Sequence, residues 1–310
     1  MTDFMPADAI AAIAGRVRRT PVMTSESLNR LTGMDLVFKC EQLQKTGSFK
    51  FRGASFAVAQ LPEDCPGVAT HSSGNHGAAL AAAAAARGFS ADVVMPENAV
   101  VSKVEAVRAY GGSVHFCAAD QAAREQGLQA LIEQGKTPIP PYDHAHIIAG
   151  QGTVAMELLA QDSTLEDIVA PIGGGGLLSG ITLAAARVAP GVRVTGAEPA
   201  GADDAARSLA AGRRVSKHDP QTMADGLRAL IGVRNFDVLA DHDIEVLTVT
   251  EDQIVEAMTL IWRHIKQVVE PSGAVPLAAV LANRERFAGR RVGIVLSGGN
   301  LEVAAMLGNL

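Results

Sequence analysis

The feature that most constrains the fold is an alternation of short apolar, β-branched runs with alanine-rich segments of helical character. Each run is too short for a stable helix and has the composition of a strand that is buried on both faces. Strands that alternate with helices in this way form parallel sheets with helices on both faces. The predicted buried strands are 91–95, 113–117, 168–172, 192–197 and 292–296.

The length of 310 residues predicts two lobes rather than one. The one proline cluster, at 138–142, is a plausible crossover between them. We expect a large domain formed by residues 1–66 and 145–310 and a small domain formed by 67–144. A ligand of such an α/β protein binds where the lobes meet, outside the carboxyl ends of the strands.

Charge and composition exclude several classes of protein. The formal net charge of -6 lacks the basic footprint of a nucleic-acid-binding protein. The N-terminal segment has no uninterrupted apolar stretch, and the alanine-rich run 78–86 is too short to span a bilayer, so we expect a cytoplasmic protein without a membrane partner. The three cysteines have neither disulfide nor zinc spacing.

Four consecutive glycines follow the predicted strand 168–172 and come directly before an alanine-rich helix. Their N–H groups can turn toward one point, and the helix N-terminus behind them favours an anion. Glycines also let a phosphate approach the backbone closely. We predict a phosphate site here, with a plain flexible turn as the alternative. The glycines are Gly173, Gly174, Gly175 and Gly176.

A dinucleotide-binding turn is the competing interpretation of this run. Gly174 and Gly176 have the spacing of the first two fingerprint glycines, and Glu198 follows about 20 residues later. The third fingerprint position, which needs glycine or alanine for close helix packing, is Ser179. Residues in other loops must therefore decide.

Lys50 lies between glycines and next to two phenylalanines, in the segment QKTGSFKFRGA. An apolar pocket lowers the pKa of a lysine and makes it a Schiff-base nucleophile, and aromatic neighbours suit such a pocket. On local grounds alone, a solvated lysine on a helix is the commoner explanation.

Two further polar loops have the position of site loops. In HSSGNHG (71–77), Ser73 and Asn75 either cap the following helix or face a ligand. In SGGN (297–300), which follows the predicted strand 292–296, Ser297 either bonds a heterocycle nitrogen or is a turn residue.

Together these loops resemble the fold-type-II pyridoxal phosphate enzymes, in particular the serine racemase and serine/threonine dehydratase branch, which includes 3-hydroxyaspartate ammonia-lyases. The resemblance extends from Arg19-Thr20-Pro21 to Asn300. It implies a fold like that of the tryptophan synthase β chain, pyridoxal 5'-phosphate as the cofactor and a homodimer. The dinucleotide interpretation then loses, because it leaves the lysine and serine loops unexplained.

The resemblance also implies roles for individual residues. Lys50 forms the Schiff base with the cofactor, Asn75 bonds the ring hydroxyl, and Ser297 meets the pyridine nitrogen. The four glycines and Leu177 hold the phosphate. Lys50 is then the catalytic base on one face of the substrate, and Ser73 serves the opposite face. Substrate contacts are predicted at Ser72, Ser73, His76 and Arg124.

The expected reaction is dehydration of serine, threonine or 3-hydroxyaspartate to a 2-oxo acid and ammonia. A neutral hydroxyl at the pyridine nitrogen stabilises a carbanion weakly, which favours loss of a β-hydroxyl or reprotonation at Cα. Racemisation is the alternative, because threonine dehydratases usually have alanine at the position of Ser73. Ala229-Leu230 replaces a serine pair of the racemases and argues against efficient serine racemisation. A catalytically idle cofactor-binding protein is the remote alternative.

Two more features have both a functional and a plain interpretation. Arg124 either holds the second carboxylate of 3-hydroxyaspartate or is a solvated helix arginine. The segment 198–204 resembles the divalent-cation site of the family, with Glu198, the Ala202 carbonyl and Asp204 as ligands. Such an oxygen set suits magnesium, with calcium or manganese as alternatives. A solvated acidic loop is the plain interpretation.

Overall fold

The structure is a computed structural model, and it describes residues 5–72 and 74–302. Its larger sheet has six strands in the order β1-β2-β10-β7-β8-β9. All neighbours in this sheet run parallel except β1, which pairs antiparallel with β2 at the edge. The strands are β1 (Val22–Thr24), β2 (Asp35–Cys40), β7 (Asp167–Pro171), β8 (Arg193–Pro199), β9 (Glu245–Val249) and β10 (Arg291–Leu296).

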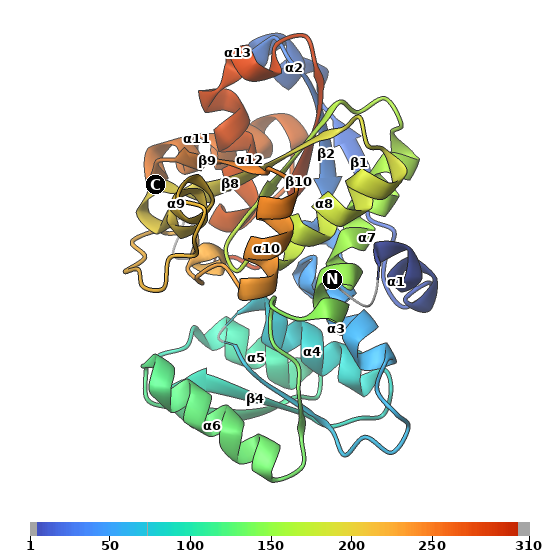
Figure 1. Cartoon of the computed structure of the whole chain (residues 1–310), viewed down its shortest axis with the longest axis vertical. Coiled ribbons are helices and arrows are strands. Elements are labelled where there is room, and N and C mark those ends of the chain that lie inside the picture. The colour runs from blue at the N-terminus through green and yellow to red at the C-terminus, as the bar shows by residue number, and fades with distance from the viewer. Residues whose placement is uncertain (1–4, 73, 303–310) are drawn as a thin grey trace.

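The smaller sheet has four parallel strands in the order β5-β4-β3-β6. Figure 1 shows this sheet with α4, α5 and α6 as a lobe of its own below the larger sheet. Its strands all lie within the predicted small domain, whose boundaries stay a prediction. They are β3 (Val68–His71), β4 (Ala91–Pro96), β5 (Ser113–Cys117) and β6 (Thr137–Pro138).

Helices cover both sheets, and α3 with α7 connects the two lobes (Figure 1). In the described residues no helix is both long and apolar enough to cross a membrane. The α-helices are α1 (Pro6–Ala12), α2 (Glu26–Thr32), α3 (Lys50–Ala59), α4 (Asn75–Ala85), α5 (Val101–Ala109), α6 (Gln121–Glu133), α7 (Ala145–Gln161), α8 (Gly176–Val188), α9 (Asp204–Ala210), α10 (Val233–Asp241), α11 (Glu251–Ile265), α12 (Pro271–Ala282) and α13 (Arg284–Phe287). The short 3-10 helices are η1 (Glu41–Leu43), η2 (Lys45–Gly47), η3 (Ala200–Ala202) and η4 (Asp225–Leu227).

The larger sheet has an apolar core on each face. Val169 and Ile294 point to one face, where they pack with α12, and Ile168, Ala170 and Val295 point to the other, where they pack with α7 and α8. Successive residues of a strand face opposite sides, so a strand covered on both sides reads as a continuous apolar run. This confirms the predicted fold class: a two-lobed α/β protein with parallel sheets and helices on both faces.

All five predicted strands are present, with ends within two residues of the prediction. One of them was wrongly described as buried. β5 is the edge strand of the smaller sheet, and most of its side chains are exposed or half-buried, with Phe116 at 51% exposure. An edge strand has a neighbour on one side only, and its apolar composition does not reveal this.

The order of the strands places the predicted loops together. β2, β10, β7 and β8 are consecutive neighbours in the larger sheet and run in the same direction. Their carboxyl ends therefore lie along one edge, where the lysine, serine and glycine loops and the acidic segment follow them. The smaller sheet is entered after α3 and left before α7, so the lobes meet at this edge.

Candidate active site

Lys50 lies where three distant segments meet. The residue before it, Phe49, donates its backbone N–H to the carbonyl of Ser297 at 3.0 Å, which ties the start of α3 to the loop after β10. The Lys50 Nζ donates to the carbonyl of Pro141 at 2.8 Å, in the crossover that returns from the smaller sheet. The lysine loop, the serine loop and the proline cluster therefore share one location.

The surroundings of Lys50 favour its neutral form. Burial lowers the pKa of this lysine to about 8, although the carboxylate of Glu270 acts in the opposite direction. The ring of Phe49 lies 5.2 Å from Nζ and contributes to the apolar surroundings. A lysine with this pKa is neutral in a substantial fraction near neutral pH, as a nucleophile or general base must be. The interpretation as a solvated helix lysine is therefore wrong.

Asn75 is held by two polar partners at the start of α4. Its Nδ2 donates to both carboxyl oxygens of Glu270, at 2.8 and 3.1 Å, and its Oδ1 accepts from Asn300 Nδ2 at 2.9 Å. The N-cap residue of α4 is Gly74, and among the described residues no side chain caps this end of the helix. Asn75 therefore does not act as a helix cap, and the first and third loops are joined through its amide.

The glycine run forms a strained turn at the N-terminus of α8. Gly175 has a left-handed φ of +92°, and Gly176 is the first residue of the helix. A Cβ at Gly173 would lie 2.9 Å from the Cα of Leu227, and one at Gly176 would lie 2.9 Å from the carbonyl of Tyr142. Backbone atoms thus exclude a side chain at these two positions, so packing alone requires glycine there, and phosphate binding by the run stays a prediction.

The carbonyl of Gly174 is fixed by residues that the sequence did not single out. Asn235 Nδ2 donates to it at 2.6 Å, and the N–H of Gly232 donates at 3.0 Å. Asn235 is fully buried, and Leu177, in the first turn of α8, is buried as well. The turn is therefore a rigid element whose N–H groups stay available, as an anion cradle requires.

The predicted substrate contacts lie at or near the carboxyl end of β3, in the smaller lobe. The hydroxyl of Ser72 accepts from the N–H of Gly74 at 3.3 Å. His76 is buried, its Nε2 donates to the carbonyl of Ile139 at 3.0 Å, and burial together with the charge of Lys50 lowers its pKa to about 3. Ser73 lies outside the described residues. Contact of these residues with a substrate stays a prediction.

Arg124 is half-buried on α6, where its Nε donates to the carbonyl of Asp120 at 3.3 Å. Its charge reaches His71 at the end of β3, since it adds to burial in lowering the pKa of that histidine. Arg124 therefore lies close to the edge at which the loops converge, and its role stays a prediction.

The acidic segment follows β8 and contains two buried carboxylates. Glu198 accepts from the N–H of Ala206 at 2.7 Å, and Asp204 accepts from the N–H of Ile231 at 2.8 Å. Burial, and the neighbouring Asp204, raise the pKa of Glu198 to about 8. The interpretation as a solvated loop is wrong for these two side chains. Within the described residues no three His, Cys, Asp or Glu side chains group together, so a cation here would also need carbonyl or water ligands such as Ala202.

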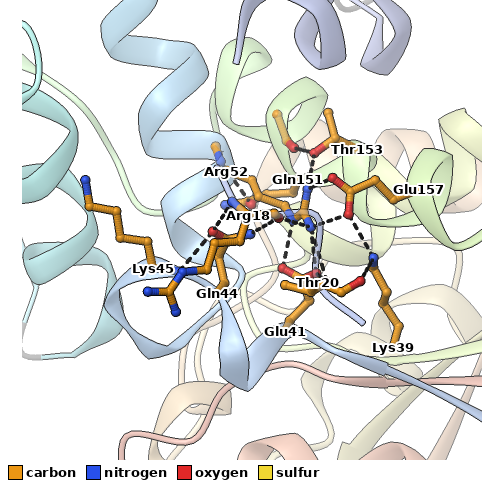
Figure 2. Close-up of polar contacts among 12 residues, drawn as sticks. Arg18, Thr20, Lys39, Glu41, Gln44, Lys45, Arg52, Gln151, Thr153 and Glu157 are labelled. Carbon is orange, nitrogen blue, oxygen red and sulfur yellow. Dashed lines mark hydrogen bonds and ion pairs between the residues drawn. The ribbon is translucent and has the colours of Figure 1, made fainter. Parts of the chain in front are cut away.

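A buried ionic network anchors the helix that carries Lys50 (Figure 2). Arg52 makes a bidentate contact with Glu41, with N–O distances of 2.7 and 2.8 Å, and a second bidentate contact with Glu157, also at 2.7 and 2.8 Å. Lys39 donates to Glu157 at 2.8 Å. The network joins α3 to α7 and to the end of β2. It fixes the direction of the first turn of α3, and with it the position of Lys50.

These observations fit pyridoxal phosphate. A half-buried lysine of lowered pKa suits a Schiff base, and a glycine cradle at a helix N-terminus suits a phosphate. Ser297 is 2% exposed at the end of β10, where a hydroxyl can meet a ring nitrogen. Glu270, Asn235 and Arg52 were not predicted as parts of the site. The chain offers no local signal for them, because their partners are distant in sequence.

Comparison with known proteins agrees with this arrangement. The family model described as "Pyridoxal-phosphate dependent enzyme" matches residues 13–298. A beta-hydroxyaspartate dehydratase of Paracoccus denitrificans is 46% identical over 302 residues, which cover 96% of this chain and 96% of that protein. A serine racemase of Arabidopsis thaliana is 47% identical over 298 residues, 94% of this chain and 90% of that protein.

Solved structures have the same architecture. The structure of maize serine racemase superposes with a TM-score of 0.95 at 42% identity and covers 98% of this chain and 95% of its own. The family match extends over nearly the whole chain and includes the lysine loop, the glycine run and Ser297. The chain belongs to the pyridoxal-phosphate dependent enzyme family, in the fold-type-II group.

Proposed function

We propose that this enzyme is an ammonia-lyase that dehydrates a small 3-hydroxy amino acid to a 2-oxo acid and ammonia. The observation that carries the proposal is Lys50, a half-buried residue whose amine has a lowered pKa and lies at the meeting point of the site loops. The substrate class is supported by the beta-hydroxyaspartate dehydratase, with 46% identity. 3-Hydroxyaspartate is therefore the first candidate substrate, and serine and threonine follow.

The residues of the site can divide the work as follows. When bound, pyridoxal phosphate accepts the electrons of a bond broken at the substrate Cα. Lys50 would hold the cofactor through its amine, and the same amine would serve as the base that removes the α-proton, which its lowered pKa permits. The N–H groups of the glycine turn and Leu177 hold the phosphate, Asn75 bonds the ring hydroxyl, and the hydroxyl of Ser297 meets the ring nitrogen.

Arg124 is proposed to recognise a second carboxylate on the substrate. Its guanidinium lies near the end of β3, beside the loop 71–77. A bidentate contact with the second carboxylate of the substrate would select 3-hydroxyaspartate over serine and threonine. Ser72 and His76, in the same loop, are proposed to contact the rest of the substrate.

Racemisation is the second candidate activity, and it is supported by the serine racemases among the relatives. It requires a proton donor on the face opposite Lys50, which we assign to Ser73. Ala229-Leu230, where racemases have a serine pair, argues that elimination is the faster reaction with serine.

The test is a panel of L- and D-enantiomers of 3-hydroxyaspartate, serine and threonine. Release of 2-oxo acid, change of optical rotation and exchange of the α-proton in deuterated water are measured for each. We expect 2-oxo acid release to exceed racemisation. Racemisation that outpaces elimination on every substrate would reverse the assignment, and no reaction with any of them would favour an idle cofactor-binding protein.

The variant Arg124→Ala, measured on the same panel, tests whether Arg124 recognises the second carboxylate of the substrate. We expect a selective loss on 3-hydroxyaspartate, equivalent to about 2–4 kcal/mol in kcat/KM, because only that substrate has the second carboxylate. Arg108→Ala, on α5 at the opposite face of the smaller sheet, is the control and should not discriminate among substrates. An equal loss on all three substrates would remove Arg124 from their recognition.

Three further properties are proposals. A magnesium ion fits Glu198, the carbonyl of Ala202 and Asp204, because a cation would offset the mutual repulsion of two buried carboxylates. A homodimer and a cytoplasmic location follow from the family resemblance and the charge. Analytical ultracentrifugation tests the first of these two and cell fractionation the second.

A further inference from the structure

Glu270 is a buried carboxyl in the middle of the site that the predicted roles leave unused. It is 4% exposed and forms the N-cap of α12. Its backbone N–H donates to the carbonyl of Gly298 at 3.1 Å, and a Cβ at Gly298 would collide with its carboxyl oxygen. The side chain is thus packed directly beneath the serine loop.

The carboxylate controls the orientation of Asn75. Both oxygens of Glu270 accept from the Asn75 Nδ2, at 2.8 and 3.1 Å. The Oδ1 of Asn75 accepts from Asn300, whose Nδ2 also donates to the carbonyl of Thr46 at 2.9 Å. The amide of Asn75 therefore has one orientation in which both of its ends are satisfied, and Glu270 determines it.

The same carboxylate acts on Lys50. Its negative charge raises the pKa of Lys50 against the larger effect of burial. The other charged groups that act on Glu270 are Asp225 on η4 and Lys103 on α5, and these two form an ion pair with each other. Their effects on Glu270 oppose each other. Phe49, next to Lys50, and Glu270 itself donate their backbone N–H groups to the adjacent carbonyls of Ser297 and Gly298, so Lys50 and Glu270 flank the same loop.

We propose that Glu270 is a positioning residue of the active site, which orients the Asn75 amide toward the cofactor and places a carboxylate beside the loop that Lys50 also flanks. The inference rests on the proposed role of Lys50 as the residue that carries the cofactor. Glu270 does not touch the reacting atoms. It acts through Asn75 and Lys50, and its two effects can be separated by substitution.

The effect on Lys50 is tested in the full chain after the cofactor has been removed with hydroxylamine. The rate of Lys50 acetylation by acetic anhydride is followed by mass spectrometry from pH 6 to pH 10. Glu270→Gln has the same shape without the charge, so the midpoint for Lys50 should move to lower pH and acetylation near pH 7 should become about three- to five-fold faster. Asp167→Asn removes a buried carboxylate far from Lys50 and is the matched control, with an unchanged midpoint.

The effect on Asn75 is tested by the affinity of each variant for pyridoxal phosphate, measured by fluorescence titration. Glu270→Gln keeps an acceptor for the Asn75 amide and should bind the cofactor within about two-fold of wild type. Glu270→Ala removes the acceptor and should bind it about ten-fold more weakly, as should Asn75→Ala. The double variant should be no weaker than either single one, because both changes break the same interaction.

These readouts are independent of the reaction catalysed. If the substrate panel fails but the midpoint and the affinities change as expected, the inference stands and the proposed function falls. An unchanged Lys50 midpoint in Glu270→Gln would overturn the electrostatic part. Additive losses in the double variant, or cofactor affinity unchanged in Glu270→Ala, would overturn the positioning part. Asn75→Ala tests that part even if Glu270→Ala fails to fold.

Discussion

Two cations lie two residues apart on α3, and their surroundings are opposite. Arg52 is fully buried and makes bidentate contacts with two carboxylates, Glu41 and Glu157 (Figure 2). Lys50 has a carbonyl as its hydrogen-bond partner, and its interaction with Glu270 is electrostatic, without a hydrogen bond. Burial alone would lower the pKa of both, but the carboxylates raise that of Arg52 above its usual value, whereas that of Lys50 falls to about 8.

The carboxylates of the two regions differ in the same way. Burial would raise the pKa of Glu157, but the hydrogen bonds from Arg52 and Lys39 bring it below its usual value. Glu270 has an amide as its partner, and burial raises its pKa to about 7. A buried charge is stable where its pairing is complete, and its protonation becomes adjustable where the pairing is incomplete. One helix thus provides an anchor at Arg52 and a reactive group at Lys50.

Removal of the reactive group should have the largest effect. We expect Lys50→Ala to abolish turnover and the visible absorbance of the bound cofactor, because no other lysine of the sequence lies in a comparable glycine-flanked motif. Stability should change little, since the Lys50 side chain is outside the ionic network. Lys45→Ala, in the same segment, is the control and should keep its absorbance. A visible spectrum unchanged in Lys50→Ala would refute the assignment of this lysine.

Removal of Arg52 should mainly lower the stability of the fold. Arg52→Met leaves Glu41 and Glu157 buried without their partner, and this should cost about 3–5 kcal/mol in the free energy of unfolding. Urea denaturation measures the loss. Arg87→Met, which removes an arginine bonded mainly to backbone carbonyls at the surface, is the control and should cost much less. Equal losses would show that the network has no special weight.

The pH dependence of stability should have opposite signs in the two regions. The pKa of Glu157 is lowered, so its contribution to stability is present above the unfolded value near 4.5 and is lost as pH falls through the folded pKa. The pKa of Glu270 is raised from 4.5 to about 7, so its cost to stability is absent below pH 4.5, develops as pH rises from 4.5 to about 7 and is complete above that.

Substitution by glutamine separates these contributions. Relative to wild type, Glu270→Gln should gain stability between pH 5 and pH 7, by on the order of 3 kcal/mol at most. Glu157→Gln should lose stability at neutral pH, and the loss should shrink toward pH 3. Urea denaturation at each pH gives the differences. Parallel curves for both variants would mean that the two carboxyls have the same surroundings, against the comparison above.

The sequence predicted those parts of the molecule that have local signals. The strand 292–296 is an apolar run, and Lys50 lies in a specific motif, so both were found. The apolar pattern does not predict β2, because Lys39 interrupts it. This lysine can be buried because it pairs with Glu157, which lies 118 residues away in the sequence. Glu270 meets Asn75 across 195 residues. A charge can be buried when its partner arrives through the fold, and such pairs leave no pattern in a local segment.

The smallest effect is expected at a third region, where Glu198 and Asp204 are buried and the imidazole of His218, 3.2 Å from Asp204, is the one ion-pair partner that the described residues provide. A magnesium ion would convert this region from an incompletely paired one into one that resembles the Arg52 network. Binding to the folded state alone should stabilise it by about 1–2 kcal/mol at a concentration roughly ten times the Kd. Thermal unfolding with magnesium and with a chelator measures this difference.

Two neighbouring aspartates make the matched pair for that measurement. Asp204→Asn should remove the effect of magnesium, because Asp204 is buried beside Glu198. Asp203→Asn should keep the effect of magnesium, because Asp203 is half-buried and pairs with Arg207 on the surface of α9. If the wild type unfolds at the same temperature with magnesium and with chelator, the two carboxyls are neutralised by protons instead of by a metal ion. The raised pKa of Glu198, about 8, would then describe its state in the cell.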